Sequence, residues 1–266
     1  MPFARNSDLS VYFERGGAGQ PLLFISGTGS DLRNKPNQFD SPLAESFELI
    51  CYDQRGLGQT GNPDGDFTMA QYADDAVALL DHLGLEQVPV MGVSFGGMVA
   101  QELLIRHPDR VSVAVLACTS SGGAGGASFP LHEIAHLEPR QRAITQLKTA
   151  DLQVTDEWIA EYPDKFETRL AMALNNVRSD RDEDGAMKQL LARAAHDTYD
   201  RLPQIEHPVL LAGGEFDGIA PVANMQAMAA QMANSELKMF AGGHMFLIQD
   251  RAAYPYIVQW LESRLG

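Results

Sequence analysis

Short, continuously apolar runs alternate with amphipathic runs along much of the chain. A sheet with one wet face would alternate apolar and polar positions, whereas continuous apolar runs are typical of parallel strands that are buried on both faces. Strands that alternate with helices predict an α/β fold with a mostly parallel sheet flanked by helices. The expected strands are residues 9–15, 21–26, 47–53, 87–93, 111–118, 207–214 and 235–243.

The clearest helix signal lies between residues 68 and 84. Thr68, with Gln71 three positions later, matches a capping box, in which each residue satisfies a backbone N–H of the first turn. Gly84 stands where a left-handed residue commonly ends a helix. We therefore expect a helix that begins after Thr68 and ends before Gly84.

The alternation stops after residue 119. The stretch "SSGGAGGAS" at 120–128 predicts a flexible hinge that lets a cap move, and the helical patterns that follow contain no strand signal. We expect residues 1–119 to form the first part of an α/β sheet domain, 120–202 an inserted helical cap, and 203–266 the second part of the sheet domain.

Composition narrows the class of partner. The chain has 266 residues, 45% of them hydrophobic, which is enough for one substantial core. Its net charge of −15 opposes binding to nucleic acid or to an anionic membrane, so we expect a small-molecule substrate and leave homo-oligomer formation open. Cys51 and Cys118 lie in apolar runs, as buried free thiols do. Together with the lack of a signal-peptide pattern, this favours the cytoplasm.

The stretch "MGVSFGGM" at 91–98 places a serine at the junction of an expected strand and an expected helix. G-x-S-x-G at such a junction is the nucleophile elbow, in which Gly92 and Gly96 give room for a strained turn that exposes the Ser94 hydroxyl. The backbone N–H of Phe95, at the positive end of the helix, can then stabilise an oxyanion. The motif predicts a serine nucleophile.

A serine nucleophile needs a base and an acid that orients the base. His244 follows the last expected strand in "AGGHMF", where the two preceding glycines let an imidazole reach over the strand ends. The loop "GGEFDGIAP" offers Glu215 and Asp217 as the acid, and either gives the chain order serine, acid, histidine that this elbow uses.

Two other motifs suggest different chemistry. Residues 56–61 spell the glycine fingerprint of a dinucleotide site, but Asn62 and Pro63 follow, so no helix N-terminus faces a pyrophosphate. His132, Glu133 and His136 spell a zinc-hydrolase motif, which we keep as a remote alternative because Pro139 is expected to end that helix. We expect no metal and no organic cofactor.

The chain resembles the α/β-hydrolase superfamily over nearly its whole length, and most closely the group of 3-oxoadipate enol-lactonases. The resemblance implies Ser94 as nucleophile, Asp217 as acid, His244 as base, and the N–H groups of Thr28 and Phe95 as the oxyanion hole. It rests on five segments in the family's order: "FISGTGS", "YDQRGLGQT", "GVSFGGMVAQELLIRHPDRV", "GGEFDGIAP" and "AGGHMF".

Within this resemblance one position departs from the family. Ser26 stands where the family often has histidine in the oxyanion loop, which leaves the anchoring of Thr28 open. Asp53 and Arg55 are by the same resemblance structural supports. Serine rather than aspartate at the elbow distinguishes the chain from dehalogenases and epoxide hydrolases of this fold.

These observations predict a serine hydrolase that cleaves a small carboxylic ester or lactone through an acyl-enzyme. The expected apolar pocket is roofed by aromatic residues of the cap, with Phe129, Trp158, Tyr162 and Phe166 as substrate-binding residues. Two alternatives use the same triad: hydrolysis of a C–C bond or acyl transfer, and a ligand-binding or signalling homologue that turns over slowly.

Overall fold

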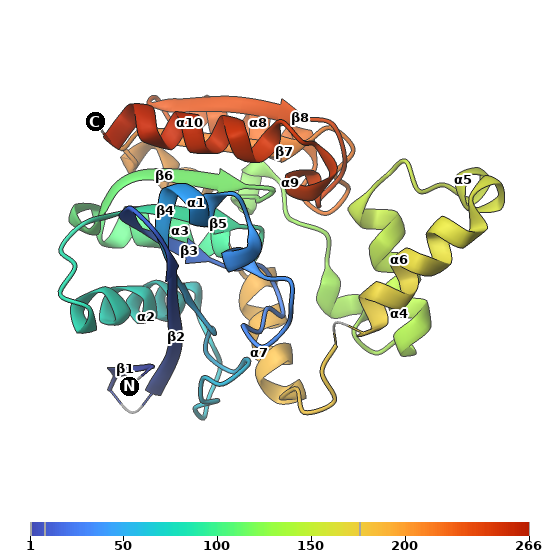
Figure 1. Ribbon diagram of the computed structural model, residues 1–266, viewed down its shortest axis with the longest axis horizontal. Coiled ribbons are helices and arrows are strands. Elements are labelled where there is room, and N and C mark those ends of the chain that lie inside the picture. Colours follow the sequence, from blue (N-terminus) through green and yellow to red (C-terminus); the bar gives the residue numbers. More distant parts are fainter. Residues whose placement is uncertain (1, 8, 176, 266) are drawn as a thin grey trace.

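The computed structural model describes residues 2–7, 9–175 and 177–265. Over these residues eight strands form one sheet, in the order β1-β2-β4-β3-β5-β6-β7-β8 (Figure 1). β2 pairs antiparallel with β1 and β4, and the other neighbours are parallel. The strands are β1 (Phe3–Asn6), β2 (Leu9–Gly17), β3 (Gln20–Ile25), β4 (Phe47–Tyr52), β5 (Val88–Val93), β6 (Val111–Ala117), β7 (Val209–Gly214) and β8 (Ser235–Phe240).

The seven expected strands are present, with ends within about three residues of those expected. The sequence analysis missed β1, because its four residues alternate between exposed and buried positions and contain no apolar run. β1 lies at the antiparallel edge of the sheet, where it pairs with β2 and where the Asn6 side chain donates to Asp75 on α2 at 2.7 Å.

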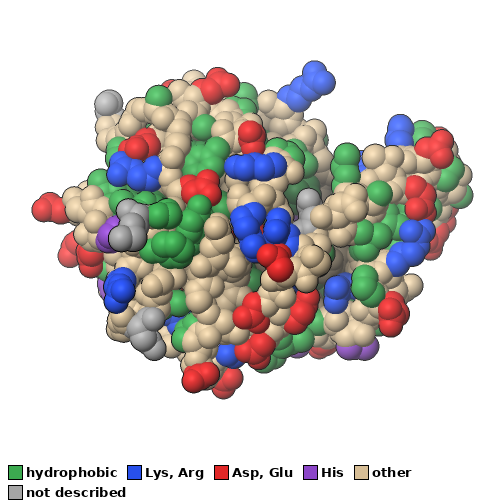
Figure 2. All heavy atoms as spheres, turned by 60° about the horizontal axis from the view of Figure 1, so that its bottom comes forward, with side chains coloured by type: hydrophobic (Ala, Val, Ile, Leu, Met, Phe, Trp, Pro, Cys, Tyr) green, Lys and Arg blue, Asp and Glu red, His purple; other side chains and the backbone are tan. Residues whose placement is uncertain are grey.

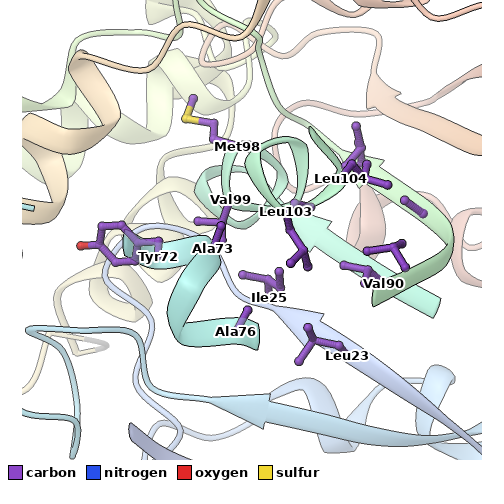
Figure 3. Packing of buried hydrophobic residues seen from close by; sticks show 14 of the residues in the cluster. Leu23, Ile25, Tyr72, Ala73, Ala76, Val90, Met98, Val99, Leu103 and Leu104 are labelled. Atoms are coloured by element: carbon purple, nitrogen blue, oxygen red, sulfur yellow. The ribbon is translucent and has the colours of Figure 1, made fainter. Parts of the chain in front are cut away.

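Helices cover both faces of the sheet, which explains why its strands are continuously apolar. Alternate residues of β3 enter two different clusters: Leu23 and Ile25 pack on one side, Leu22 and Phe24 on the other. Figure 3 shows the first cluster, where the sheet meets α2 and α3. These covering helices are α2 (Met69–His82), α3 (Phe95–Arg106) and α8 (Val222–Gln231) on the first side, and α1 (Leu43–Ser46), α9 (Phe246–Gln249) and α10 (Ala253–Leu265) on the second.

The predicted start and end of α2 are confirmed. The Thr68 hydroxyl accepts from the N–H of Gln71, and the Gln71 side chain accepts from the N–H of Thr68 at 2.9 Å. Gly84 has φ +66°, the left-handed conformation expected after the helix.

Only helical elements occur in the described residues between β6 and β7. In Figure 1, α4, α5 and α6 stand apart from the sheet, and we call residues 139–175 the helical lobe. Its small core consists of Ala143, Val154, Phe166 and Leu170, and Figure 2 shows a notch in the surface between the lobe and the rest of the molecule. The helices of the stretch are α4 (Pro139–Ala150), α5 (Asp156–Glu161), α6 (Pro163–Asn175) and α7 (Glu183–Ala194), with short 3₁₀ turns at Gly123–Gly125, Leu131–Ile134 and Tyr199–Gln204.

The glycine-rich stretch 120–128 differs from the flexible hinge expected from its sequence. The Asn224 side chain donates to the Ser120 hydroxyl at 2.9 Å and to the carbonyls of Gly126 and Ala127. A Cβ at Gly122 would lie 1.9 Å from the carbonyl oxygen of His196. These glycines therefore allow close packing of the backbone, and the hinge motion stays a prediction.

Two further expectations concern the thiols and the membrane. Cys51 and Cys118 are buried and free, as predicted, and burial raises the pKa of both thiols. None of the described helices is both long enough and apolar enough to cross a membrane.

Candidate active site

Ser94 occupies a strained turn between β5 and α3. Its φ of +56° lies in the left-handed region that residues other than glycine rarely adopt. A Cβ at Gly92 would lie 2.3 Å from the carbonyl oxygen of Gly96, and a Cβ at Gly96 would lie 2.0 Å from that of Ile25. Side chains are excluded at both positions, so the glycines allow the turn that the motif predicts.

The structure brings Ser94, His244 and Asp217 into one hydrogen-bonded chain. His244 Nε2 lies 2.9 Å from Ser94 Oγ, and His244 Nδ1 lies 2.7 Å from Asp217 Oδ2. In this arrangement the imidazole can accept the serine proton, while the carboxylate fixes the tautomer with the proton on Nδ1.

The choice between the two candidate acids follows from their burial. Asp217 is 2% exposed, and its second oxygen accepts from the N–H groups of Ile219 and Ala220 at 2.8 and 2.9 Å. Glu215 is exposed, with no described contact to the histidine. The structure therefore places Asp217, and not Glu215, beside His244.

The C-terminal end of α4 holds the two loops that carry the acid and the histidine. The carbonyl of Thr149 accepts from the N–H of Gly218 at 3.0 Å, and the carbonyl of Ala150 accepts from the N–H of His244 at 2.6 Å. The last carbonyls of a helix have no partner within the helix, so they are free to accept these bonds. The sequence analysis missed this contact, since it uses backbone atoms that no motif reveals.

The expected oxyanion donors are the N–H of Thr28, in the loop after β3, and the N–H of Phe95, at the start of α3. A Cβ at Gly27 would lie 3.5 Å from the Cβ of Ser94, so this loop runs directly beside the serine. Within the described chain, the N–H groups of Thr28 and Phe95 have no hydrogen-bond partner, whereas the N–H of Gly29 donates to the Gln189 side chain at 2.8 Å. Two backbone N–H groups near Ser94 thus have no hydrogen-bond partner in the described chain.

Three glutamines hold the loop in which Ser26 replaces the histidine of the family pattern. Gln38 donates to the Ser26 hydroxyl at 3.1 Å, and Gln54 donates to the Ser26 carbonyl at 2.7 Å. Gln189 donates to the Gln54 side chain at 3.1 Å and, through its own oxygen, accepts from Gly29. No motif in the sequence marks Gln189, because it lies on α7, about 160 positions from the loop.

Asp53 and Arg55 lie beneath the site and make structural contacts. Asp53 accepts from the N–H groups of Leu32 and Gln59 at 2.8 and 2.9 Å, and burial raises its pKa to about 6. Arg55 pairs with the buried carboxylate of Asp75 at 2.7 Å. Neither contact reaches Ser94.

The four aromatic residues expected to bind substrate have different surroundings. Phe166 is buried in the core of the helical lobe, against which Trp158 also packs, and Trp158 is 5.5 Å from Tyr162 between ring centroids. Phe129 instead lies beside the acid loop, where its N–H donates to the carbonyl of Ile219 at 2.9 Å. The lobe needs a core of its own, which accounts for Phe166 and Trp158 without a ligand.

The alternative motifs take other conformations. Residues 131–134 form a short 3₁₀ turn, so His132 and His136 do not share the face of an α-helix, and Pro139 begins α4 rather than ending a helix. In the part of the chain that the structure describes, no group of three or more His, Cys, Asp or Glu residues could hold a metal ion. After the glycines at 56–61, the next helix begins at Met69.

Comparisons with known proteins agree with this geometry. A family model described as "alpha/beta hydrolase fold" matches residues 20–250. The chain is 27% identical to 3-oxoadipate enol-lactonase 2 of Acinetobacter baylyi, over 96% of this chain and 93% of that protein. It is 30% identical to 2-hydroxymuconate semialdehyde hydrolase of Pseudomonas sp. (strain CF600), over 91% and 86%.

Among solved structures, the enol-lactonase from Burkholderia xenovorans LB400 superposes with a TM-score of 0.79 at 23% identity, over 99% of both chains. At this identity the likeness concerns the fold. The match of the family model over most of the chain shows the family itself. The chain belongs to the alpha/beta hydrolase family and is a hydrolase of that type.

Proposed function

We propose that this hydrolase cleaves a small carboxylic ester or lactone through an acyl-enzyme on Ser94. The hydrogen-bonded chain from Ser94 through His244 to Asp217 carries the proposal, because it joins a nucleophile, a base and a buried acid. The unpartnered N–H groups of Thr28 and Phe95 support it by offering donors for a developing oxyanion.

The reaction proceeds in two halves. Ser94 Oγ attacks the carbonyl carbon while His244 Nε2 takes its proton, and the carbonyl oxygen becomes an oxyanion that accepts from Thr28 and Phe95. The C–O bond to the leaving alcohol then breaks, and His244 returns the proton to that oxygen. In a lactone the alcohol stays attached to the acyl group.

Water completes the reaction. His244 takes a proton from a water molecule that attacks the acyl carbon, and the bond to Ser94 Oγ breaks as the proton passes back to that oxygen. The products are the alcohol and a carboxylic acid. Asp217 stabilises the imidazolium in both halves.

The named relatives support the substrate class without fixing it. One is named as an enol-lactonase, which fits a lactone or ester. The other is named as a semialdehyde hydrolase, and this name specifies no ester, so hydrolysis of a C–C bond is the second candidate. Acyl transfer to an acceptor other than water uses the same triad and is kept beside it. The expected cap at 120–202 is proposed to roof the substrate, with Phe129 nearest the acid loop.

A fluorophosphonate probe tests the nucleophile. We expect one labelled serine per chain in the wild type, with labelling and ester turnover both abolished in Ser94→Ala and both unchanged in Ser263→Ala. Labelling that survives Ser94→Ala would contradict the assignment. Activity that is lost to a chelator and restored by zinc would favour the remote alternative through His132 and His136.

Turnover of a panel of short esters and lactones then separates the candidate activities. Steady-state hydrolysis supports an enzyme, whereas a single burst of acylation without further turnover supports a ligand-binding homologue. Release of product from a C–C substrate but from no ester would place the second candidate first.

A further inference from the structure

A cavity of about 90 Å³ lies beside the second turn of α3, between the segment 127–132 and the end of α7. Met98, Ser128, His132, Arg193 and His196 contribute to its wall. Its volume corresponds to about three water molecules. Ser94, Asp217 and His244 do not line it, and neither does any Asp or Glu side chain.

Arg193 brings a buried cation to this cavity. The residue is only 4% exposed, and burial lowers its pKa to about 10, so the guanidinium stays charged at neutral pH. One terminal nitrogen donates to the carbonyl of Phe129 at 2.6 Å, and the other donates to the Ser128 hydroxyl. Both acceptors are neutral, and Nε has no partner among the described residues.

A buried charge is costly unless an opposite charge meets it. Arg193 forms no ion pair with a carboxylate of the described chain, although acidic residues outnumber basic ones, 35 to 20, in the whole sequence. The other ionisable groups of the wall add no negative charge. Burial lowers the pKa of His196 to about 3, so its ring is neutral at physiological pH.

We propose that this cavity binds a small carboxylate through Arg193. A guanidinium is a strong partner for a carboxylate, and Arg193 lines the cavity without an ion pair to any carboxylate of the described chain. The volume suits a group of the size of formate or acetate. The carboxylate is either part of the substrate, in which case the inference rests on the proposed ester or lactone chemistry, or a separate organic acid.

The cavity is connected to the acid of the active site by hydrogen bonds. Arg193 donates to Ser128, Ser128 donates to the carbonyl of Ile219 at 2.9 Å, and the N–H of Ile219 donates to Asp217 at 2.8 Å. The negative charge of Asp217 raises the pKa of Arg193 against the effect of burial. A carboxylate in the cavity would therefore act on the loop that positions Asp217.

Sodium acetate at constant ionic strength tests whether the cavity binds a carboxylate. We expect acetate to raise the Tm in a saturable way, beyond the effect of chloride, in the wild type, in Ser94→Ala and in the exposed control Arg140→Met. Arg193→Met should abolish the response. Ala127→Glu, at an exposed position of the cavity wall, should also abolish it by supplying a carboxylate from the chain.

This binding experiment does not depend on turnover, because Ser94→Ala is expected to bind acetate. An acetate effect no larger than that of chloride would overturn the proposal. So would a saturable effect that persists in Ala127→Glu and in Arg193→Met. If Arg193→Met does not fold, Ala127→Glu decides alone.

A pair of matched esters then identifies the source of the carboxylate. If the substrate carries it, Arg193→Met should raise the KM for monomethyl succinate about tenfold or more relative to dimethyl succinate, and acetate should compete with the half-ester. If the carboxylate is a separate acid, the two KM values should change equally while acetate still binds. A protein that hydrolyses neither these esters nor any ester or lactone of the panel, but binds acetate, would contradict the proposed function and leave the carboxylate site supported.

Discussion

Two of the junctions between the active site and the stretch from β6 to β7 differ in the kind of contact that they make. At the first, backbone carbonyls at the end of α4 accept from the acid loop and from His244. At the second, the Gln189 side chain on α7 bonds to Gly29 and to Gln54 beside the oxyanion loop. One junction holds the base and its acid, and the other holds the loop of the expected oxyanion donors.

This difference indicates how each junction responds to substitution. Backbone contacts do not depend on which side chains α4 carries, so only a residue that displaces the backbone should break them. Side-chain contacts disappear with the side chain. The first junction should therefore be insensitive to most substitutions in α4 and sensitive to added volume, and the second should respond to a single change in α7.

The largest expected effect lies in the acid loop that the first junction holds. Asp217→Asn should reduce kcat by about 10⁴-fold, because the amide cannot fix the required tautomer or stabilise the imidazolium. Glu215→Gln should leave kcat nearly unchanged, since that side chain is exposed. Steady-state kinetics on one ester decide this, and the reverse ranking would assign the acid to Glu215.

Added volume at the first junction is the next test. A Cβ at Gly243 would lie 2.1 Å from the carbonyl oxygen of Ala150, so Gly243→Ala must move His244 or the end of α4. A displacement of about 1 Å costs about 10²-fold in kcat/KM. Gly61→Ala is the matched control, because its Cβ would meet its nearest neighbour at an ordinary 3.4 Å. Equal activity of the two variants would show that the first junction does not position His244.

The pH dependence of the free energy of unfolding tests the burial of His196, which lies just after α7. Burial lowers the pKa of His196 from 6.5 to about 3, so between these values the unfolded chain binds a proton that the folded chain does not. The contribution of neutral His196 to the free energy of unfolding is fully present above pH 6.5 and is lost as the pH falls towards 3. Between pH 7 and pH 5 the loss amounts to about 2 kcal/mol of the free energy of unfolding.

His196→Gln removes this titration. Its unfolding free energy, measured by urea denaturation, should therefore fall less between pH 7 and pH 5 than that of the wild type. Asp53, whose pKa burial raises to about 6, shifts stability in the opposite direction over the lower part of this range in both proteins, so the difference between them isolates the histidine. His136→Gln serves as control, and a pH dependence equal in all three proteins would refute the effect.

The smallest expected effect is at the second junction. Gln189→Leu removes one bond to Gly29 and one to Gln54, and should lower kcat about five- to tenfold by loosening the oxyanion loop. KM should change little. Gln153→Leu, at an exposed position of the helical lobe, is the control. An unchanged kcat would mean that the contacts of Ser26 with Gln38 and Gln54 hold the loop without α7.

The sequence was sufficient where local chemistry determines structure. The elbow at Ser94, the cap of α2 at Thr68 and the buried strands all follow from steric room, helix-end hydrogen bonds and periodicity. The order of motifs also predicted which loops would meet, and the structure brings His244 to Ser94.

The sequence was insufficient where contacts depend on tertiary packing. Gly122 and its neighbours looked flexible, since composition does not distinguish a glycine needed for motion from one needed for close approach. No sequence motif marks Arg193 on α7, because its burial without a carboxylate partner results from tertiary packing. Phe166 matched a pocket residue but lies in the core of the lobe.

The hydrogen bond between His244 and Ser94 joins positions 150 residues apart along the chain. Contacts of such separation form only after the intervening chain has been ordered, so they belong to the late events of folding. β7 and β8 must dock before the histidine can approach the serine, which means that a partly folded chain has secondary structure but no nucleophile. Regain of activity during refolding therefore reports the docking of β7 and β8, and a folding intermediate that lacks it is inactive.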